Sequence, residues 1–135
     1  MNRTGVWERG GGAKAGQKDA LTEKIIGCVF RVQKVLGCGF LEKVYENSLA
    51  HELRRAALSA VQQTPIDVWY DDVVVGQYFA DILVNDEVLV ELKVVKALED
   101  IHFAQCLNYL KATGKRVCLL VNFGQAKVEI RRVVH

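Results

Sequence analysis

Three charged side chains stand in two apolar segments that are typical of strands. Asp81 lies in the first segment, and Glu91 and Lys93 lie two residues apart in the second, so these two point to one face. Two carboxylates about 4 Å apart repel by roughly 4 kcal/mol at an effective dielectric near 20. A proton, the Lys93 ammonium or a divalent cation relieves this repulsion. The spacing alone leaves open a plain salt bridge on a solvated sheet face.

The two carboxylates can meet only if the turn between the two segments has an odd number of residues. A two-residue turn would place Asp81 opposite Val90 and turn it away from Glu91. We therefore predict a three-residue turn, Asn85-Asp86-Glu87, or a bulge that shifts the register by one residue. Asn and Asp tolerate the left-handed backbone conformation that such turns use.

Composition bounds the class of protein. The 135 residues fit one domain with one core, and half of them are hydrophobic, which excludes a disordered chain. A net charge of +2 neither requires nor excludes nucleic acid. The four cysteines form no C-x-x-C pair, which predicts reduced thiols in a cytoplasmic protein. No apolar run has the length that crosses a membrane.

The hydrophobic periodicity predicts an α/β domain in the order α-α-β-β-β-α-β-β, with a short mixed central sheet flanked by helices. Residues 1–17 are rich in Gly and basic residues and lack periodicity, so we expect a flexible tail followed by a domain over residues 18–135. Asp19 is the expected cap of the first helix, which ends before Gly37. Pro65 predicts an edge strand. The other predicted helices cover 40–57 and 99–113, and the strands cover 60–70, 73–84, 87–94, 115–123 and 127–134.

Two of the predicted helices carry polar side chains beside their buried faces. Glu42 and Tyr45 are three residues apart and share one edge of the second helix. His102, Gln105 and Tyr109 are three and four residues apart and form a polar stripe on the third helix. We expect this stripe to face the same polar edge of the sheet as the strand lysine.

Four short motifs follow one another along the chain. They are Gly39-Phe40-Leu41-Glu42-Lys43-Val44-Tyr45 (G-x-x-E-x-x-Y), Asp81, Glu91-Leu92-Lys93 and Gln105-x-x-x-Tyr109. In this order, and with these intervening elements, they resemble the GxxExxY family of the PD-(D/E)XK nuclease superfamily over about residues 21–134. The resemblance implies a restriction-endonuclease-like core, with a divalent-metal site on the polar edge of its sheet.

The resemblance also implies a role for each motif residue. Asp81 and Glu91 would bind Mg²⁺ or Mn²⁺ together with the backbone carbonyl of Leu92, and Glu42 would add a ligand or hold a metal-bound water. Lys93 would orient or activate the attacking water and stabilise the transition state. Four further side chains are expected to support the site: Tyr45, His102, Gln105 and Tyr109.

Two functions of different classes are compatible with these residues. The first is a Mg²⁺- or Mn²⁺-dependent nuclease that hydrolyses phosphodiester bonds in nucleic acid, with DNA favoured over RNA. The second is a non-catalytic nucleic-acid-binding or protein-partner module on the same fold. Hard oxygen ligands beside a lysine favour the nuclease, because a binding module has no reason to keep a carboxylate pair and a lysine on one strand face. A homodimer or a protein partner stays open as the source of additional affinity.

Overall fold

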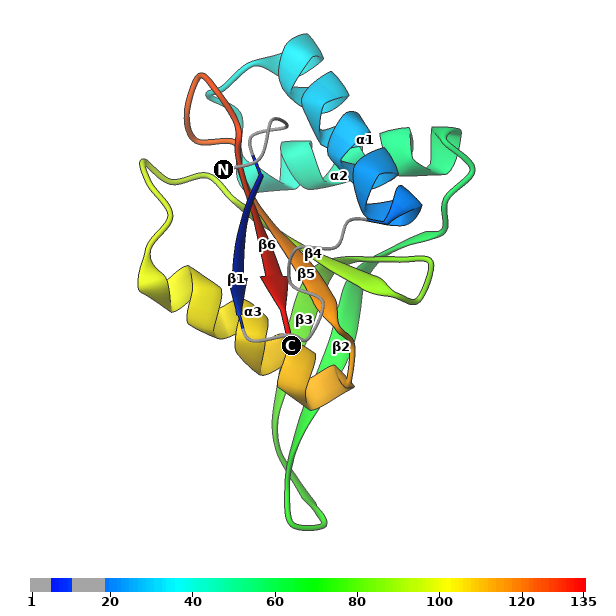
Figure 1. Cartoon of the computed structure of the whole chain (residues 1–135), viewed down its shortest axis with the longest axis vertical. Coiled ribbons are helices and arrows are strands. Elements are labelled where there is room, and N and C mark those ends of the chain that lie inside the picture. The colour runs from blue at the N-terminus through cyan, green and yellow to red at the C-terminus, as the bar shows by residue number, and fades with distance from the viewer. Residues whose placement is uncertain (1–5, 11–18) are drawn as a thin grey trace.

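The computed structural model describes residues 6–10 and 19–135 of the chain (Figure 1). The helices and strands, in chain order, are β1 (Val6–Gly10), α1 (Ala20–Leu36), α2 (Glu42–Arg55), β2 (Ala60–Tyr70), β3 (Val73–Val84), β4 (Val88–Lys93), α3 (Asp100–Thr113), β5 (Val117–Asn122) and β6 (Glu129–Val134). The expected order of helices and strands is confirmed, with one further strand, β1, in front of it.

The sheet separates two hydrophobic clusters. Its strand order is β1-β6-β5-β4-β3-β2, with β4 parallel to β5 and β3 antiparallel to both β2 and β4. Helices α1 and α2 cover one face, and α3 covers the other (Figure 1). Val90 and Leu119 belong to the cluster under α1 and α2, whereas Leu89 and Leu120 belong to the cluster under α3. The restriction-endonuclease-like architecture, a mixed sheet between helices, is therefore present.

Part of the expected flexible tail is a strand. β1 pairs in parallel with β6, Val6 opposite Ile130 and Gly10 opposite Val134. The sequence did not indicate this strand because the stretch is rich in glycine and charge, and its pairing depends on the open edge that β6 offers. The rest of the expected tail, residues 1–5 and 11–18, lies outside the described residues. The domain boundary at residue 18 stays a prediction.

The turn between β3 and β4 has the three residues that the sequence predicts. Ile82 pairs with Val90 and Val84 with Val88, which leaves 85–87 as the turn. Asn85 and Asp86 adopt φ angles of 51° and 56°, in the left-handed region that these residue types tolerate. Continuing this register by one residue places the Asp81 position opposite the Glu91 position, which the candidate site requires.

The hairpin of β2 and β3 is long and projects beyond the body of the domain (Figure 1). β2 lies at the edge of the sheet, as its proline predicted. Near the base of the hairpin, Gln63 has a φ of 52°. On β3, Ala80 packs in the cluster under α3 while Ile82 packs under α1 and α2. Asp81 lies between them and takes the position opposite Gln63. Because residues two apart in a regular strand share a face, β3 must twist at Asp81.

A side-chain clamp fixes the chain where it leaves β4. The buried Asn122 side chain accepts hydrogen bonds from the amides of Val95 and Gly124, at 3.0 and 2.9 Å, and donates to the Val95 carbonyl at 2.9 Å. The Phe123 amide donates to the Lys93 carbonyl at 2.9 Å. The segment that follows the site lysine is therefore held by hydrogen bonds to the end of β5.

Replacing Gly124 by alanine is expected to destabilise this clamp. An added Cβ would clash with the backbone of Val95, which is not the movable end of a side chain. We expect Gly124→Ala to lower the free energy of unfolding by about 2 kcal/mol or more, measured by urea denaturation. The matched control is Gly27→Ala in α1, where a Cβ has no neighbour within 4 Å, and where alanine is expected to stabilise by about 0.5–1 kcal/mol. Equal effects of the two variants would contradict the role of Gly124.

The cysteines are free thiols. Cys38 is exposed, and Cys28, Cys106 and Cys118 are buried. This agrees with the expected reduced thiols. Within the described residues, no helix combines the length and the apolar character needed to span a membrane.

Candidate active site

The carboxylates of Asp81 and Glu91 each accept a hydrogen bond from a backbone amide of the neighbouring strand. The Asp81 amide donates to Glu91 Oε1 at 2.8 Å, and the Leu92 amide donates to Asp81 Oδ2 at 2.7 Å. Regular pairing of β3 with β4 extends only as far as Ile82 and Val90. Beyond that pair, the two carboxylates take the acceptor positions that backbone carbonyls occupy in a ladder. One oxygen of each carboxylate thus holds the strands in register.

Burial disfavours ionisation of both carboxyl groups of this pair at once. Glu91 is only 3% exposed. Burial, followed by the charge of Asp81, raises the pKa of Glu91 to about 8, although the Asp81 amide and Lys93 act in the opposite direction. Burial also raises the pKa of Asp81, against the hydrogen bond from Leu92. The pair therefore favours a bound proton or a cation near neutral pH.

Glu42 brings a third carboxylate to the pair. It opens α2, where the positive end of the helix dipole favours a negative charge. Its pKa is raised, first by burial and then by the charge of Asp81, and Lys93 lowers it. The structure thus brings Glu42, the strand carboxylates and the lysine together, as the motifs predicted.

A fourth carboxylate, Glu46, was missed from the sequence. It is 2% exposed, and its oxygens accept hydrogen bonds from Lys43 Nζ at 3.0 Å, Gln62 Nε2 at 2.7 Å and Gln63 Nε2 at 2.8 Å. Its charge contributes to the raised pKa of Asp81, after burial. A signal was available, because Glu46 lies one helical turn after Glu42 and three residues before the buried Leu49.

Lys93 is the last residue of β4 and is half-buried beside the carboxylates. Its charge partly offsets the rise that burial causes in the pKa of Glu42, Asp81 and Glu91. Among the described residues, no salt bridge joins its ammonium to a carboxylate. The ammonium is therefore near the cluster without being tied to one member of it.

Two residues of the α3 stripe lie at the same site. Tyr109 is buried, and Gln105 Nε2 donates to its hydroxyl oxygen at 3.0 Å. Burial, followed by the charges of Glu91 and of Asp81, raises the pKa of Tyr109 to about 12. The phenol therefore keeps its proton at neutral pH and can donate a hydrogen bond toward the carboxylates.

Tyr45 makes contacts that hold the fold rather than the carboxylates. Its hydroxyl donates to the Gly37 carbonyl at 2.7 Å and accepts from the Phe40 amide at 3.3 Å. Its ring stacks on Phe123, with the centroids 4.5 Å apart. Tyr45 thus fixes the loop that leads into α2, and so positions the carboxylates of that helix.

His102 is also engaged locally. Its Nδ1 accepts a hydrogen bond from the Glu99 amide at 2.9 Å, as part of the capping box that begins α3. The neutral ring therefore carries its proton on Nε2. His102 nevertheless lines the same cavity as Lys93, Gln105 and Tyr109, so the polar stripe faces the edge that the sequence predicted.

The donor chemistry of the cluster fits a hard divalent cation. Carboxylate and carbonyl oxygens are the ligands that Mg²⁺ and Mn²⁺ prefer. Burial, and after it the charges of neighbouring carboxylates, raises the pKa of Glu42, Asp81 and Glu91 although Lys93 opposes the rise, so a cation would favour the ionised forms. Within the described part of the chain, no three acidic, His or Cys side chains are arranged around one point. Asp81 and Glu91 each use one oxygen on a backbone amide. The second Asp81 oxygen accepts a long hydrogen bond of 3.4 Å from Gln63 Nε2, so a cation would compete with Gln63 for it.

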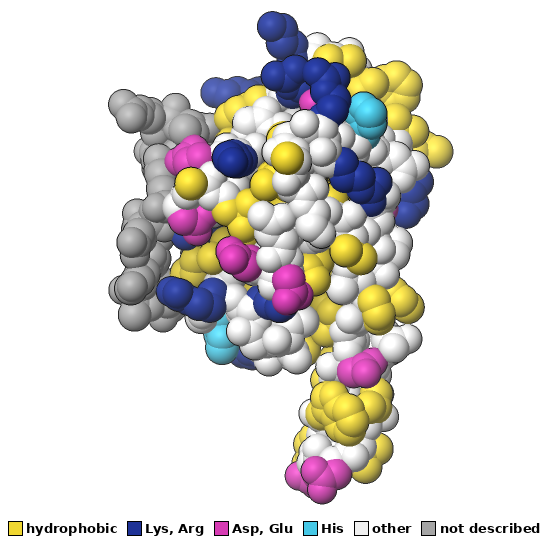
Figure 2. Space-filling view, turned by 90° about the vertical axis from the view of Figure 1, so that its right-hand side faces the viewer, with side chains coloured by type: hydrophobic (Ala, Val, Ile, Leu, Met, Phe, Trp, Pro, Cys, Tyr) yellow, Lys and Arg dark blue, Asp and Glu magenta, His cyan; other side chains and the backbone are white. Residues whose placement is uncertain are grey.

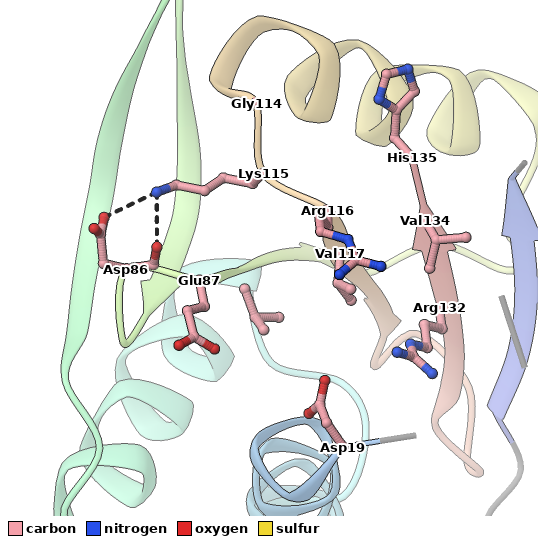
Figure 3. A pocket seen from close by; sticks show the side chains of 11 residues that line it. Asp19, Asp86, Glu87, Gly114, Lys115, Arg116, Val117, Arg132, Val134 and His135 are labelled. Carbon is pink, nitrogen blue, oxygen red and sulfur yellow. Dashed lines mark hydrogen bonds and ion pairs between the residues drawn. The ribbon is translucent and has the colours of Figure 1, made fainter. Parts of the chain in front are cut away.

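Two cavities lie at opposite ends of the central strands. One, of about 810 Å³, opens beside Lys93 between α3 and the projecting hairpin. The other, of about 490 Å³, lies where β4 and β5 begin (Figure 3). Its lining mixes acidic and basic side chains, and Lys115 Nζ donates to the Asp86 carbonyl at 2.8 Å and to its carboxylate at 3.2 Å. No residue of the predicted site lines this second cavity.

Comparison with known proteins agrees with this geometry. Residues 19–133 match the family model of the PD-(D/E)XK nuclease superfamily. No curated protein and no solved structure matches the chain. The matched segment contains α2, β3, β4 and α3, the elements that carry the carboxylates, the lysine and the polar stripe. The chain therefore belongs to the PD-(D/E)XK nuclease superfamily.

Proposed function

We propose that this protein is a divalent-metal-dependent nuclease that hydrolyses phosphodiester bonds in nucleic acid, with DNA as the favoured substrate. One observation carries the proposal: Glu91, 3% exposed, is held against Asp81 by reciprocal hydrogen bonds, with Glu42 and Lys93 beside them. A fold gains little from burying carboxylates at a raised pKa, since apolar residues would pack there at lower cost. Such clusters are typical of functional sites.

Each residue of the cluster has a chemical role in the proposed reaction. Asp81, Glu91, the carbonyl of Leu92 and Glu42 would hold Mg²⁺ or Mn²⁺. When bound, the ion supplies a water of lowered pKa and neutralises charge on the scissile phosphate. The Lys93 ammonium donates hydrogen bonds to the phosphate or to the attacking water, where negative charge develops.

The surrounding residues keep these groups in place. Glu46 ties α2 to β2 through Gln62 and Gln63, and so fixes the position of the helix that carries Glu42. Gln105 Nε2 donates to the Tyr109 hydroxyl oxygen, which leaves the phenol proton available for a hydrogen bond to a carboxylate or to a bound water. These contacts reduce the freedom of the cluster before substrate binds.

We further propose that the chain belongs to the GxxExxY branch of the superfamily. Support comes from the stretch 39–45, in which Glu42 reaches the cluster while Tyr45 ties down the loop before it. The free thiols support a reducing compartment such as the cytoplasm.

The test is a cleavage assay on single-stranded, double-stranded and branched DNA and RNA, with Mg²⁺, Mn²⁺ or EDTA. We expect cleavage with either metal and none in EDTA. The activity should co-elute with the protein in size-exclusion chromatography, which excludes a contaminating nuclease. Mn²⁺ should also raise the unfolding temperature, because it binds only the folded chain. An inactive protein that binds no metal would instead support a non-catalytic nucleic-acid-binding or protein-partner module.

A further inference from the structure

The cavity beside Lys93 has walls unlike those of a metal site. Its volume of about 810 Å³ lies in the range of small-molecule pockets, far beyond the needs of one ion. Three of the lining side chains are aromatic: Trp69 and Tyr78 from the hairpin, and Tyr109 from α3. A cavity with aromatic walls and with Lys93 and Lys111 in its lining suits a ligand that has both flat apolar faces and negative charge.

The hairpin aromatics are exposed although an apolar core lies close by. Trp69 is 60% exposed and Tyr78 is 52% exposed. Tyr78 packs on the buried Tyr109, with the ring centroids 5.8 Å apart. The register of the hairpin shifts between Val68 and Trp69, and such a bulge re-aims the side chains beside it. Figure 2 shows hydrophobic side chains along the projecting hairpin and acidic side chains at its tip. Exposed aromatic surface of this kind marks a binding site.

Polar groups in the same cavity complement a nucleotide. Gln105 and Asn108 line it from α3 and carry amides, which both donate and accept hydrogen bonds as the edges of bases do. Lys111 and Lys93 line it as well and supply positive charge for phosphates. Lys93 also belongs to the carboxylate cluster, so a ligand in the cavity lies next to the proposed reaction centre.

We propose that this cavity binds an unpaired base of a single-stranded nucleic acid, next to the phosphodiester bond that is cleaved. The inference deepens the proposed function and rests on it for the identity of the ligand. In a duplex, the faces of the bases are covered by their stacked neighbours, so aromatic side chains reach them only in single strands or at extruded bases. Trp69 and Tyr78 supply the stacking surface, and the amides of α3 contact the edge of the base.

The test compares probes with and without bases. Fluorescence anisotropy would measure binding of a fluorescein-labelled oligothymidylate of about 15 nucleotides, a strand of abasic sites of equal length, and a duplex of equal length. The measurements are made in EDTA, so that cleavage plays no part. We expect the oligothymidylate to bind at least about fivefold more tightly than the abasic strand, and more tightly than the duplex.

Two neighbouring aromatics of the hairpin provide matched variants. Trp69→Ala should weaken binding of the oligothymidylate at least about fivefold and leave binding of the abasic strand unchanged. Tyr70, 72% exposed, does not line the cavity, so Tyr70→Ala should change either affinity less than about twofold. Both side chains are exposed, and thermal unfolding will verify that both variants fold. An oligouridylate that binds more tightly than the abasic strand would show that the cavity also accepts a base of RNA.

Several outcomes would overturn the inference. The first is equal binding of the base-bearing and abasic strands, and the second is an equal loss of affinity in Trp69→Ala and Tyr70→Ala. The third is tighter binding of the duplex, and the fourth is no binding of any probe. The nuclease proposal is judged separately. A wild-type protein that cleaves without discriminating bases refutes the cavity inference alone, and one that discriminates bases but never cleaves with metal refutes the nuclease alone.

Discussion

Replacing Lys93 by alanine is expected to lower kcat at least about 100-fold while Mn²⁺ still binds. The lysine is not a ligand, and its positive charge opposes a cation at the same cluster. Removing it should therefore leave Mn²⁺ affinity unchanged or slightly tighter. The loss falls on the chemical step, because the ammonium stabilises negative charge that develops only in the transition state.

Glu91→Gln is expected to lose metal binding, whereas Lys93→Ala is expected to lose only the chemical step. The glutamine oxygen can still accept the hydrogen bond from the Asp81 amide, so the fold is kept. The substitution removes a charged oxygen ligand. Because hard cations prefer charged oxygen ligands, Mn²⁺ binding and cleavage should be lost together. Asp81→Asn should behave in the same way.

Isothermal titration with Mn²⁺ and single-turnover cleavage, run on the same preparations, separate these two defects. Lys96→Ala is the matched control, since Lys96 is exposed three residues after Lys93 and its loss changes net charge equally. It should cleave within about twofold of the wild type. Loss of Mn²⁺ binding in Lys93→Ala, or cleavage by that variant at the wild-type rate, would refute the assigned role.

The sequence predicted the helix ends that are determined by neighbouring residues in the chain. Asp19 caps α1 through a hydrogen bond to the Thr22 amide, and Gly114 ends α3 in the left-handed conformation. The turn between β3 and β4 was predicted differently, from the requirement that two carboxylates share a face. The alternation of hydrophobic residues did not distinguish a two-residue from a three-residue turn. The prediction of the β3–β4 register therefore came from the requirement that Asp81 and Glu91 share a face.

The features that the sequence did not indicate depend on contacts between distant segments. The strand at Val6–Gly10 forms only against the open edge of β6. The twist at Asp81 coincides with a left-handed Gln63 on the neighbouring strand, a residue type with no strong preference for that conformation. Helix α2 begins at Glu42, two residues later than expected, because Leu41 has an extended backbone with a ψ of 154° and is the N-cap.

The sequence predicted four charged side chains that the structure brings together, but it did not indicate Glu46 as a further support. These four side chains come together because the register of β3 and β4, continued by one residue, places Asp81 opposite Glu91, and because α2 packs against both strands. A glutamate within a helix is typical of a solvated helix face. In the structure, two glutamines of β2 donate hydrogen bonds to the Glu46 carboxylate, which is buried. These partners lie 16 and 17 residues away along the chain, so helical spacing indicates that Glu46 lies near Glu42 but does not identify its partners.

The free energy of unfolding of the metal-free protein is expected to fall as pH rises from about 5 to about 8. Burial and the Asp81 charge raise the pKa of Glu91 to about 8 from its ordinary value of 4.5. Between pH 4.5 and about 8 the folded state binds more protons than the unfolded state. The stability that protonated Glu91 contributes is therefore fully present below pH 4.5 and is lost as the pH rises through about 8. The raised pKa values of Asp81 and Glu42 act in the same direction, and Lys93 offsets part of the effect.

Glu91→Gln isolates this effect because the amide cannot ionise. Urea denaturation in EDTA should show a wild-type loss of roughly 2–4 kcal/mol across this pH range, and a much flatter profile for the variant, which becomes the more stable protein near pH 8. Glu87→Gln, at an exposed turn residue, should follow the wild type within about 0.5 kcal/mol. Mn²⁺ at about 100 times its Kd should then stabilise the wild type by about 2.7 kcal/mol and leave Glu91→Gln unchanged, because the cation replaces the proton between the carboxylates. Parallel pH profiles for wild type and Glu91→Gln would show that Glu91 ionises as an ordinary surface carboxylate does, and the cluster would then have no need of a cation.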